Sequence, residues 1–600
     1  MATEATEVLV FALKSSANLA IIAGAVLAGL ELILLLLAVS VGLRLVAERL
    51  AVPYAAVLVI GGLILAFVPG LPEVTLPPDV LFLVFIPPLL YAGAINYPLR
   101  DFRREIGPIV RLSVVMVVVS TAAVAVVAHA LHPAFTWAAA ITLGAIISPP
   151  DPVAVLSILR SLRMPREIVS ILEGEGMVND ATALVIYRLA IAAAVTGVFS
   201  PSRAAAQFLV GSVVGIAIGI AIGMIVTRIH RVTRAVPVVS NTVSLLTPFA
   251  SYLLADLVGT SGILAVVATG LYAARTVPKV LGPAARQQIF ATWTVVTFLL
   301  ESLVFILVGL ELPFVARGLN RLPLSTLLGE AAIVSLCVVL VRIAWVMPTS
   351  YVFRIIFRWL RHGHEPLPPW RYVLFISWAG LRGGDSLVLA LSLPLVTASG
   401  ARFPARDQII FITFSVIFVT LVVQGLTLAP IGRWLCLGAN DEDVAEDAHA
   451  RLAAAEAGLK TLEEPSIASS PYPEVVRYLK QRHRQRARRW AAAESEPHDG
   501  ESKDVAHEHF TVAPSHEAAA IDDRRAEEYR RVRSALLDAE QQAILDLRDN
   551  GVIADDVMRR VQRDLDLETM LLETSEPVIE PVSEVPAAFG PASRPVTPPN

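Results

Sequence analysis

The sequence predicts an all-α protein that crosses a membrane many times and ends in a polar, helical tail. Of its 600 residues, 55% are hydrophobic and 17% are charged, whereas soluble proteins average about 45–50% apolar and about 25% charged residues. The apolar residues form continuous runs, which favours membrane helices, because the strands of a membrane barrel alternate. The net charge of −4 hides a division near Leu437: residues 437–600 hold 20 Lys and Arg against 33 Asp and Glu.

The apolar part of the chain, residues 1–436, divides into runs separated by short polar or Pro/Gly turns. A membrane helix needs about 20 predominantly apolar residues. We therefore expect about thirteen transmembrane helices in residues 1–436 and a cytoplasmic tail in residues 437–600. The thirteen runs lie near residues 19–43, 52–69, 79–96, 108–130, 135–159, 167–197, 204–227, 237–257, 259–274, 287–313, 329–353, 371–395 and 408–435.

The basic residues predict an orientation. Nineteen Lys and Arg, from Arg44 to Arg371, fall in alternate loops and their margins, while the opposite loops hold five. Because short loops rich in Lys and Arg stay in the cytoplasm, we expect a multi-pass protein of the cell (inner) membrane. Its N-terminus would lie outside and its tail in the cytoplasm.

Composition also limits the partners. The sequence has no basic stripe of the kind that binds nucleic acid, and its two cysteines cannot build a Cys-based metal site or a disulfide framework. The tail carries no nucleotide or metal motif. We therefore expect membrane lipid as a partner, no nucleic acid and no cofactor.

The fifth run is interrupted by Ser148-Pro149-Pro150-Asp151-Pro152. Three prolines in four positions remove backbone donors and end a regular helix. A broken helix at membrane depth exposes carbonyls and helix ends, which suit a cation site beside a carboxylate. A proline kink with Asp151 reaching toward water is the structural alternative.

The sixth run carries Glu175-Gly176-Met177-Val178-Asn179-Asp180. Glu175 and Asn179 stand at i and i+4, hence on one helix face. The neighbouring Asn179 and Asp180 offer a neutral oxygen ligand beside a titratable one. A polar contact between helices is the alternative interpretation.

The twelfth run reads Gly380-Leu381-Arg382-Gly383-Gly384-Asp385. Three glycines weaken the helix around Arg382, although an arginine reaching for lipid headgroups is the alternative. Runs 5 and 12 are both interrupted and lie seven runs apart. This spacing predicts two inverted repeats, runs 1–6 and 8–13, whose broken helices cross at a transport site.

These motifs resemble those of the sodium/proton antiporters in the electroneutral branch of the monovalent cation:proton antiporter superfamily. The resemblance covers nearly all of residues 20–435. It implies thirteen helices, a dimer interface domain, a moving core domain and hence a homodimer. The matching strings are Glu175–Thr182, similar to Glu-Ser-x-x-Asn-Asp-Ala-Thr, Asp151–Val155, similar to Asp-Pro-Val-Ala-Val, Gly380–Gly383, similar to Gly-Leu-Arg-Gly, and the weaker signatures Pro87–Tyr91 and Phe305–Gly309.

The resemblance also implies the roles of the ion-binding residues. Asp180 would be the main carboxylate for cation and proton, with Asp151 as a second carboxylate, so that Na⁺ would bind at these two residues. Asn179 would support them. The family's hydroxyl ligands are replaced here by Gly176 and Pro150, so a backbone carbonyl or a water would have to take their place.

Three further residues would support the site. Ser148 lies at the break, and Arg382 would neutralise buried acid by pairing with Glu175. Together these features predict a secondary active antiporter, not an enzyme, that exchanges Na⁺ for H⁺ by alternating access and so serves pH homeostasis. Because Asn179 is an amide, Asp180 is the one titrating group of the pair Asn179-Asp180, which predicts one-for-one exchange.

Other functions remain open at this stage. A K⁺/H⁺ antiporter or a cation channel would use the same ligands. An intramembrane aspartyl protease is a remote alternative, since two aspartates could share a proton.

The tail is expected to be regulatory or to support the dimer, with an inert solubilising tail as the alternative. Its basic run Lys480–Arg489 fits a solvated helix face better than a lipid-binding segment. Helical periodicity over 521–572 predicts a hairpin with its turn at Asn550-Gly551. The Pro-rich residues 577–600 are expected to be disordered.

Overall fold

The computed structural model describes residues 30–50, 52–69, 78–97, 104–132, 135–151, 155–156, 158–159, 162, 164–197, 201–234, 236–318, 323–361, 367–437, 441–495 and 523–574. Within these ranges the elements are helices, apart from one isolated bridge between Val396 and Arg402, which confirms the predicted all-α class. The prediction of disorder in residues 577–600 falls outside the described residues.

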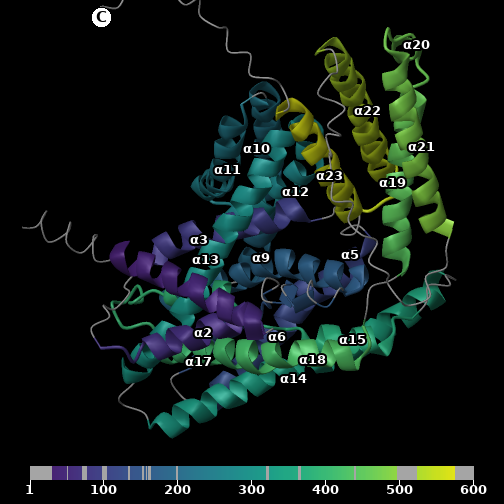
Figure 1. Cartoon of the computed structure of the whole chain (residues 1–600). Helices are drawn as coiled ribbons and strands as arrows, with labels where there is room; N and C mark the ends of the chain where they lie inside the picture. The colour runs from purple at the N-terminus through teal and green to yellow at the C-terminus, as the bar shows by residue number, and fades with distance from the viewer. Residues whose placement is uncertain are drawn as a thin grey trace, which may run out of the picture.

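The chain order of the helices can be followed in Figure 1. The first described helix is Leu30–Leu50. The helices and π-helical segments after it are α2 (Tyr54–Leu65), α3 (Pro78–Asn96), α5 (Ile106–Val110), η1 (Arg111–Val115), α6 (Met116–Leu131), α7 (Trp137–Ile147), α9 (Arg166–Thr196), α10 (Pro201–Thr233), α11 (Pro237–Leu257), α12 (Gly262–Val280), α13 (Pro283–Gly318), α14 (Leu324–Arg361), α15 (Trp370–Trp378), α16 (Gly384–Leu391), α17 (Arg406–Val419), η2 (Thr420–Gln424), α18 (Gly425–Trp434), α19 (Asp441–Thr461), α20 (Pro465–Ala468), α21 (Pro473–Ser495), α22 (Asp523–Asp549) and α23 (Asp555–Thr574).

Among the described residues, nine helices are long and apolar enough to cross a membrane. Three shorter apolar helices lie in runs 2, 3 and 5, and the pair α15 and α16 lies in run 12. Runs 5 and 12 yield short helices because each is interrupted by the predicted break. Every predicted run therefore contains helix, while the number of complete crossings stays a prediction.

The membrane helices pack into two groups. We call α5, α6, α7, α9 and α14–α18 the core bundle, because these helices pack mainly on one another, and α2, α3 and α10–α13 the scaffold bundle for the same reason. The two bundles meet where α3 and α13 contact α9, α16 and α17. Both interrupted helices belong to the core bundle.

Glycines bring helices of the scaffold bundle into close contact. A β-carbon at Gly62 of α2 would overlap the carbonyl of Ile306, and one at Gly309 of α13 would overlap the carbonyl of Val59. Helices in lipid have no hydrophobic drive to associate and depend on such close packing between small residues. The two glycines therefore fix α2 against α13.

The tail forms a helical module of α19, α21, α22 and α23, at the upper right in Figure 1. Small apolar clusters of its own hold it together, one around Leu537 and Val561 and another around Leu479 and Val532. Gly551 adopts a φ of 74° between α22 and α23, at the position predicted for the turn. Helix α19 was not predicted from the sequence, whereas α21 contains the run Lys480–Arg489 that was expected to form a helix face.

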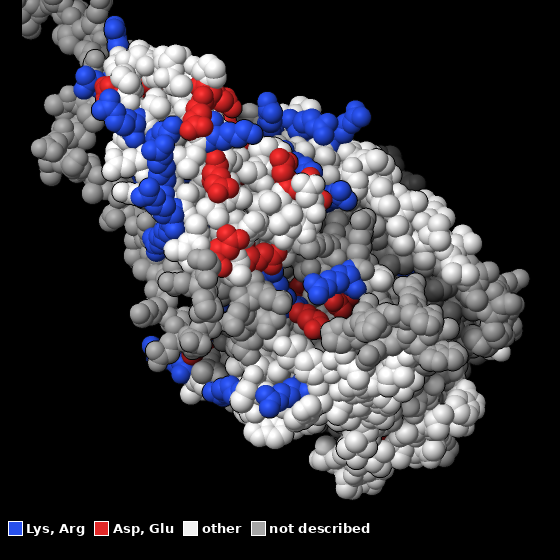
Figure 2. Space-filling view, turned by 90° about the vertical axis from the view of Figure 1, so that its right-hand side faces the viewer, with Lys and Arg blue, Asp and Glu red and all other residues white. Residues whose placement is uncertain are grey.

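The basic run Lys480–Arg489 lies within α21. Lys480 pairs with Glu463 at 2.9 Å, and His483 is buried within the tail against Glu540. Part of this run is therefore bound within the tail. Figure 2 shows charged side chains gathered on the upper part of one face, while the described residues of its lower part are mostly uncharged.

Candidate functional site

The first interrupted helix, α7, ends at Ile147 and is followed by Ser148–Asp151. Thr136 caps its start by accepting a hydrogen bond from the Ala139 N–H at 3.3 Å. Ser148 is fully buried and donates to the Gly144 carbonyl at 2.6 Å. The prolines that follow cannot continue the helix, so the chain turns away at the predicted break.

The second interruption lies between α15 and α16, over residues 379–383. It is held by the π-helical segment η2, in which Thr420 Oγ1 accepts a hydrogen bond from the Arg382 backbone N–H at 3.1 Å. Gln424, at the end of η2, donates to the Trp378 carbonyl at 3.2 Å. Single π-helical turns inside α-helices occur frequently at functional sites, and this one supports the unwound segment.

The two interruptions meet in space. The Asp151 N–H donates to the Leu381 carbonyl at 2.8 Å, and Arg382 Nε donates to the Ile147 carbonyl at 2.6 Å. The Ser386 hydroxyl adds a bond to the Ile146 carbonyl at 2.7 Å. Backbone groups freed by one break are thus satisfied by the other, and the predicted crossing of helices 5 and 12 is confirmed.

Gly383 creates the space for the Asp151 carboxylate. A β-carbon at residue 383 would overlap Asp151 Oδ2. The side chain of Asp151 therefore lies directly against the backbone of the second interrupted helix. Any larger residue at position 383 would displace the carboxylate.

Helix α9 brings a third element to the crossing. Asn179 is fully buried and its Nδ2 donates to the Pro150 carbonyl at 2.9 Å. Asn179 Oδ1 accepts no hydrogen bond from any described residue. Because a buried polar atom is costly without a partner, this oxygen is suited to face a bound cation.

A cluster of carboxylates completes the site. Asp180 and Asp385 are in hydrogen-bonding contact, and Asp151 lies close enough to interact electrostatically with Asp180. Asp180 and Asp385 are half-buried, and Asp151 is 9% exposed. Negative oxygens from α9, α16 and the break after α7 thus converge at the crossing.

Asp385 was not among the predicted site residues, although the sequence places it directly after the glycines of the twelfth run. It lies in the first turn of α16, where the positive end of the helix favours an acid. Its proximity to Asp180 arises from the packing of α16 near α9, which spacing along the chain does not predict.

The predicted pairing of Glu175 with Arg382 is wrong. Glu175 instead forms a two-pronged ion pair with Arg342 of α14, at 2.5 Å to Nη1 and 2.9 Å to Nη2, and both side chains are 1% exposed. Arg382 is fully buried and donates to carbonyls, including that of Gly380 at 2.8 Å. A planar guanidinium can donate two parallel hydrogen bonds to one carboxylate, and Arg342 is placed to donate both to Glu175.

The scaffold bundle contributes a polar pair at the same level. Tyr54, at the start of α2, donates a hydrogen bond to Glu301 of α13, and the electrostatic effect of Asp151 reaches Tyr54. The two bundles thus face each other through polar groups beside the crossing.

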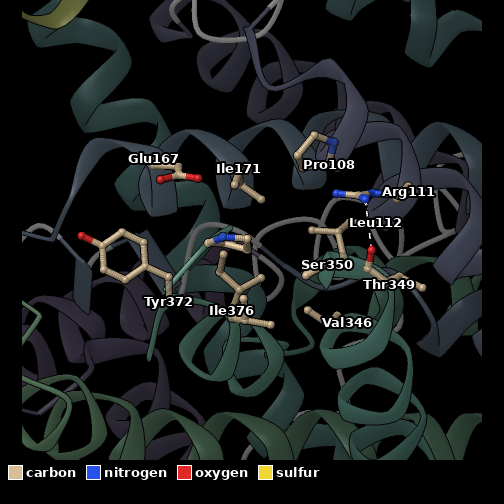
Figure 3. A pocket seen from close by; sticks show the side chains of 12 residues that line it. Pro108, Arg111, Leu112, Glu167, Ile171, Val346, Thr349, Ser350, Tyr372 and Ile376 are labelled. Carbon is tan, nitrogen blue, oxygen red and sulfur yellow. Dashed lines mark hydrogen bonds between the residues drawn. The ribbon is translucent and has the colours of Figure 1, made fainter. Parts of the chain in front are cut away.

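A small pocket of about 40 Å³ lies elsewhere in the core bundle. Figure 3 shows Glu167 and Tyr372 on one side of it and Arg111 on the other, with Arg111 Nη1 donating to the Thr349 carbonyl at 3.2 Å. Its described lining includes none of the carboxylates at the crossing. The candidate ion site therefore lies outside this pocket.

The crossing of two interrupted helices with a cluster of acids can be compared with known families. The model described as "Sodium/hydrogen exchanger, transmembrane" matches residues 34–434, more than half of the chain. The chain belongs to the sodium/hydrogen exchanger family. It is a multi-pass membrane protein and an antiporter of a monovalent cation and H⁺.

Curated relatives agree with this assignment. The exchanger is 32% identical over 560 residues to an uncharacterized Na(+)/H(+) exchanger of Mycobacterium tuberculosis, covering 91% of this chain and 96% of the relative. It is also 32% identical to the "Sodium, potassium, lithium and rubidium/H(+) antiporter" of Bacillus subtilis over 388 residues, 63% of this chain and 57% of the relative.

A solved structure has the same fold. The sodium proton antiporter MjNhaP1 from Methanocaldococcus jannaschii matches with a TM-score of 0.50 at 19% identity, covering 67% of this exchanger and 96% of that chain. The family membership that the motifs of runs 5, 6 and 12 indicated is thereby confirmed.

Proposed function

We propose that this exchanger moves Na⁺ against H⁺ across the cell membrane and that the helix crossing binds both ions. The observation that carries the proposal is the convergence of Asp151, Asp180 and Asp385 where two interrupted helices exchange hydrogen bonds. Carboxylates at membrane depth are costly without a function or a partner. The Mycobacterium relative is named a Na(+)/H(+) exchanger, which supports Na⁺ as the cation.

We infer the following ligand set. Asp180 and Asp151 supply the charged oxygens, and Asn179 Oδ1 supplies a neutral one. The Pro150 carbonyl, which accepts from Asn179, has a second lone pair for the cation, and Ser148 keeps the break in place. Asp385 adds a carboxylate that compensates for the hydroxyl that Gly176 lacks.

Exchange follows from competition for these oxygens. Two carboxylates in contact cannot both stay ionised without a proton or cation between them, because like charges at short range repel. One H⁺ or one monovalent cation between Asp180 and Asp385 relieves the same charge. The net charge of the site is then equal in both loaded states, so the proposal retains one-for-one exchange even with the additional acid.

The two bundles suggest how access alternates. The interrupted helices and α9 all belong to the core bundle, whereas Tyr54 and Glu301 belong to the scaffold bundle. We propose that the core bundle moves against the scaffold bundle once the site is occupied, because moving a bare charge through lipid is unfavourable. The scaffold bundle would form the homodimer interface.

The tail is proposed to be cytoplasmic and regulatory. It binds the core bundle through Arg166 of α9, which pairs with Glu446 and with Asp556 at 3.2 Å. It binds the scaffold bundle through Arg286, which pairs with Asp566. Because the tail contacts both bundles, movement between them must strain or break one set of contacts.

The decisive experiment is Na⁺-driven proton flux in proteoliposomes. Asp180→Asn should abolish the flux, while Asp407→Asn, an exposed acid at the start of α17, should leave it unchanged. Normal flux in Asp180→Asn would overturn the site. Replacing Na⁺ by K⁺ in the same vesicles tests the K⁺/H⁺ alternative, which is supported by the potassium in the name of the Bacillus relative.

A further inference from the structure

A larger cavity, of about 250 Å³, lies where the tail meets the membrane helices. One wall is formed by Asn96 at the end of α3 and by Arg286 and Phe290 near the start of α13. The opposite wall is formed by α23, including Arg559 and Arg563. The cavity is larger than the roughly 150 Å³ space that holds a benzene molecule in an engineered protein core.

The arginines of this cavity differ in their partners. Arg286 is buried and bound to Asp566, with Nε donating to Oδ2 at 2.9 Å. Arg560 pairs with Asp447 at 3.3 Å. Arg559 and Arg563, in contrast, form no ion pair or hydrogen bond with any residue that the structure describes.

These two arginines lie four positions apart on α23, and therefore on the same face of the helix. Both line the cavity. Arg559 is half-buried and Arg563 is exposed, so both can reach a ligand that enters from solvent. The carboxylates of Asp556 and Asp566 also line the cavity, but they pair with Arg166 and Arg286. Arg559 and Arg563 thus add two positive charges to the cavity lining that no described acid pairs with.

The position of the cavity limits the ligand. Arg286 and Phe290 stand at the beginning of the apolar stretch Pro283–Pro313 of α13, where a membrane helix leaves the headgroup region. Basic pockets at this depth on the cytoplasmic side bind the phosphates of anionic lipids. Arginine is the residue best suited to such contacts, because its planar guanidinium binds phosphate oxygens in pairs.

We propose that this cavity binds the phosphate group of an anionic ligand between Arg559 and Arg563, with Phe290 as an apolar wall. Two sources share this chemistry: the headgroup of an anionic phospholipid and a soluble phosphate. In either case the ligand joins α23 of the tail to α13 of the scaffold bundle. Its binding therefore strengthens the docking of the tail that Arg286 and Asp566 already provide.

The test measures the melting temperature of the full-length exchanger in detergent, since a ligand that binds the folded state raises it. The probes are short-chain phosphatidylglycerol, short-chain phosphatidylcholine and inorganic phosphate. The proteins are the natural chain, the double variant R559Q/R563Q and the control R484Q/R488Q. The control removes the same charge from exposed positions of α21 in the basic run.

We expect phosphatidylglycerol to stabilise the natural chain and the control, with phosphatidylcholine having no effect. The double variant should bind the effective probe about tenfold to thirtyfold more weakly, because each basic side chain near an anionic surface contributes about 1 kcal/mol. Stabilisation by inorganic phosphate as well would identify the soluble source.

Two results would overturn the proposal: no stabilisation of the natural chain by either anionic probe, or an equal loss in the double variant and the control. The melting temperatures without probe show whether each variant folds. Na⁺-driven flux is not the readout, so failure of the proposed ion site leaves this test intact.

Discussion

Arg342 and Glu175 form a fully buried ion pair in the core bundle, joining α14 to α9 one turn before Asn179. Arg342 also donates to the Ile376 carbonyl at 3.2 and 3.1 Å, so it connects α15 as well. Gly380 leaves room for this guanidinium, since a β-carbon there would overlap Arg342 Cδ. The pair thus joins three helices around the proposed ion site.

Breaking this pair should destabilise the exchanger. Arg342→Gln leaves the Glu175 carboxylate buried without a counter-charge, which typically costs about 3–5 kcal/mol. The double variant R342Q/E175Q should be less destabilised than R342Q, because no bare charge remains. Melting in detergent checks this order. Equal stability of Arg342→Gln and the natural chain would show that the pair contributes little.

Gly383→Ala should abolish or strongly reduce transport. The added β-carbon would overlap the Asp151 carboxylate, and movement of a ligand by about 1 Å lowers activity by about 100-fold in well-positioned sites. Gly329→Ala on α14 is the matched control, because no atom lies within 4 Å of the added carbon. The measurement is Na⁺-driven flux of both variants. If Gly383→Ala transports as fast as Gly329→Ala, Asp151 does not belong to the ion site.

Asp385→Asn tests the carboxylate that the sequence did not predict as a ligand. Removing one charged oxygen from the cluster should raise the apparent KM for Na⁺ by at least about tenfold, an effect typical of residues around metal sites. Asp407→Asn serves again as the exposed control. If the KM of Asp385→Asn matches that of the natural chain, Asp385 does not bind the cation.

Arg286→Gln should release the tail from the scaffold bundle. The variant leaves Asp566, 3% exposed, without its counter-charge, so α23 should exchange amide hydrogens faster. If the docked tail slows the movement between bundles by about 1 kcal/mol, transport should rise about fivefold. The control Arg531→Gln removes an ion pair within α22, between the half-exposed Arg531 and the largely buried Glu528, which does not contact the scaffold bundle. If Arg286→Gln transports more slowly although the amide hydrogens of α23 exchange faster, the docked tail does not restrain transport.

The stability of the tail should fall in acid. Burial opposes the ionisation of Glu540, but Arg486, His483 and Arg533 outweigh it and hold the pKa of Glu540 well below its usual range. A carboxyl with a lowered folded-state pKa stabilises the fold above its unfolded pKa, about 4.3, and loses this contribution as pH falls further.

The backbone amide hydrogens of α21 and α22 in the full chain should therefore exchange with solvent faster below about pH 4. Glu540→Gln should accelerate this exchange already at neutral pH and flatten the acid dependence. An acid dependence in that variant equal to that of the natural chain would assign the effect to other carboxyl groups.

Much of the fold follows from local sequence. The apolar runs predict the helices because lipid provides no partners for backbone groups. The prolines after Ile147 and the glycines around Arg382 interrupt helices 5 and 12 wherever they pack, since proline removes a donor and glycine weakens the helix. The motifs around Asp151, Asn179 and Asp180, together with the spacing of the two interruptions, were sufficient to predict that these residues share one site.

The partners of the buried charges were decided by the tertiary structure alone. Glu175 lies near two arginines from later parts of the chain, and the packing of α14 within the core bundle gives it Arg342 instead of Arg382. Asp385 contacts Asp180 although they lie 205 positions apart in the sequence. Local sequence determines where a helix must break and which charges enter the membrane. Which charge meets which depends on distances of a few ångströms between helices, and only their packing sets these distances.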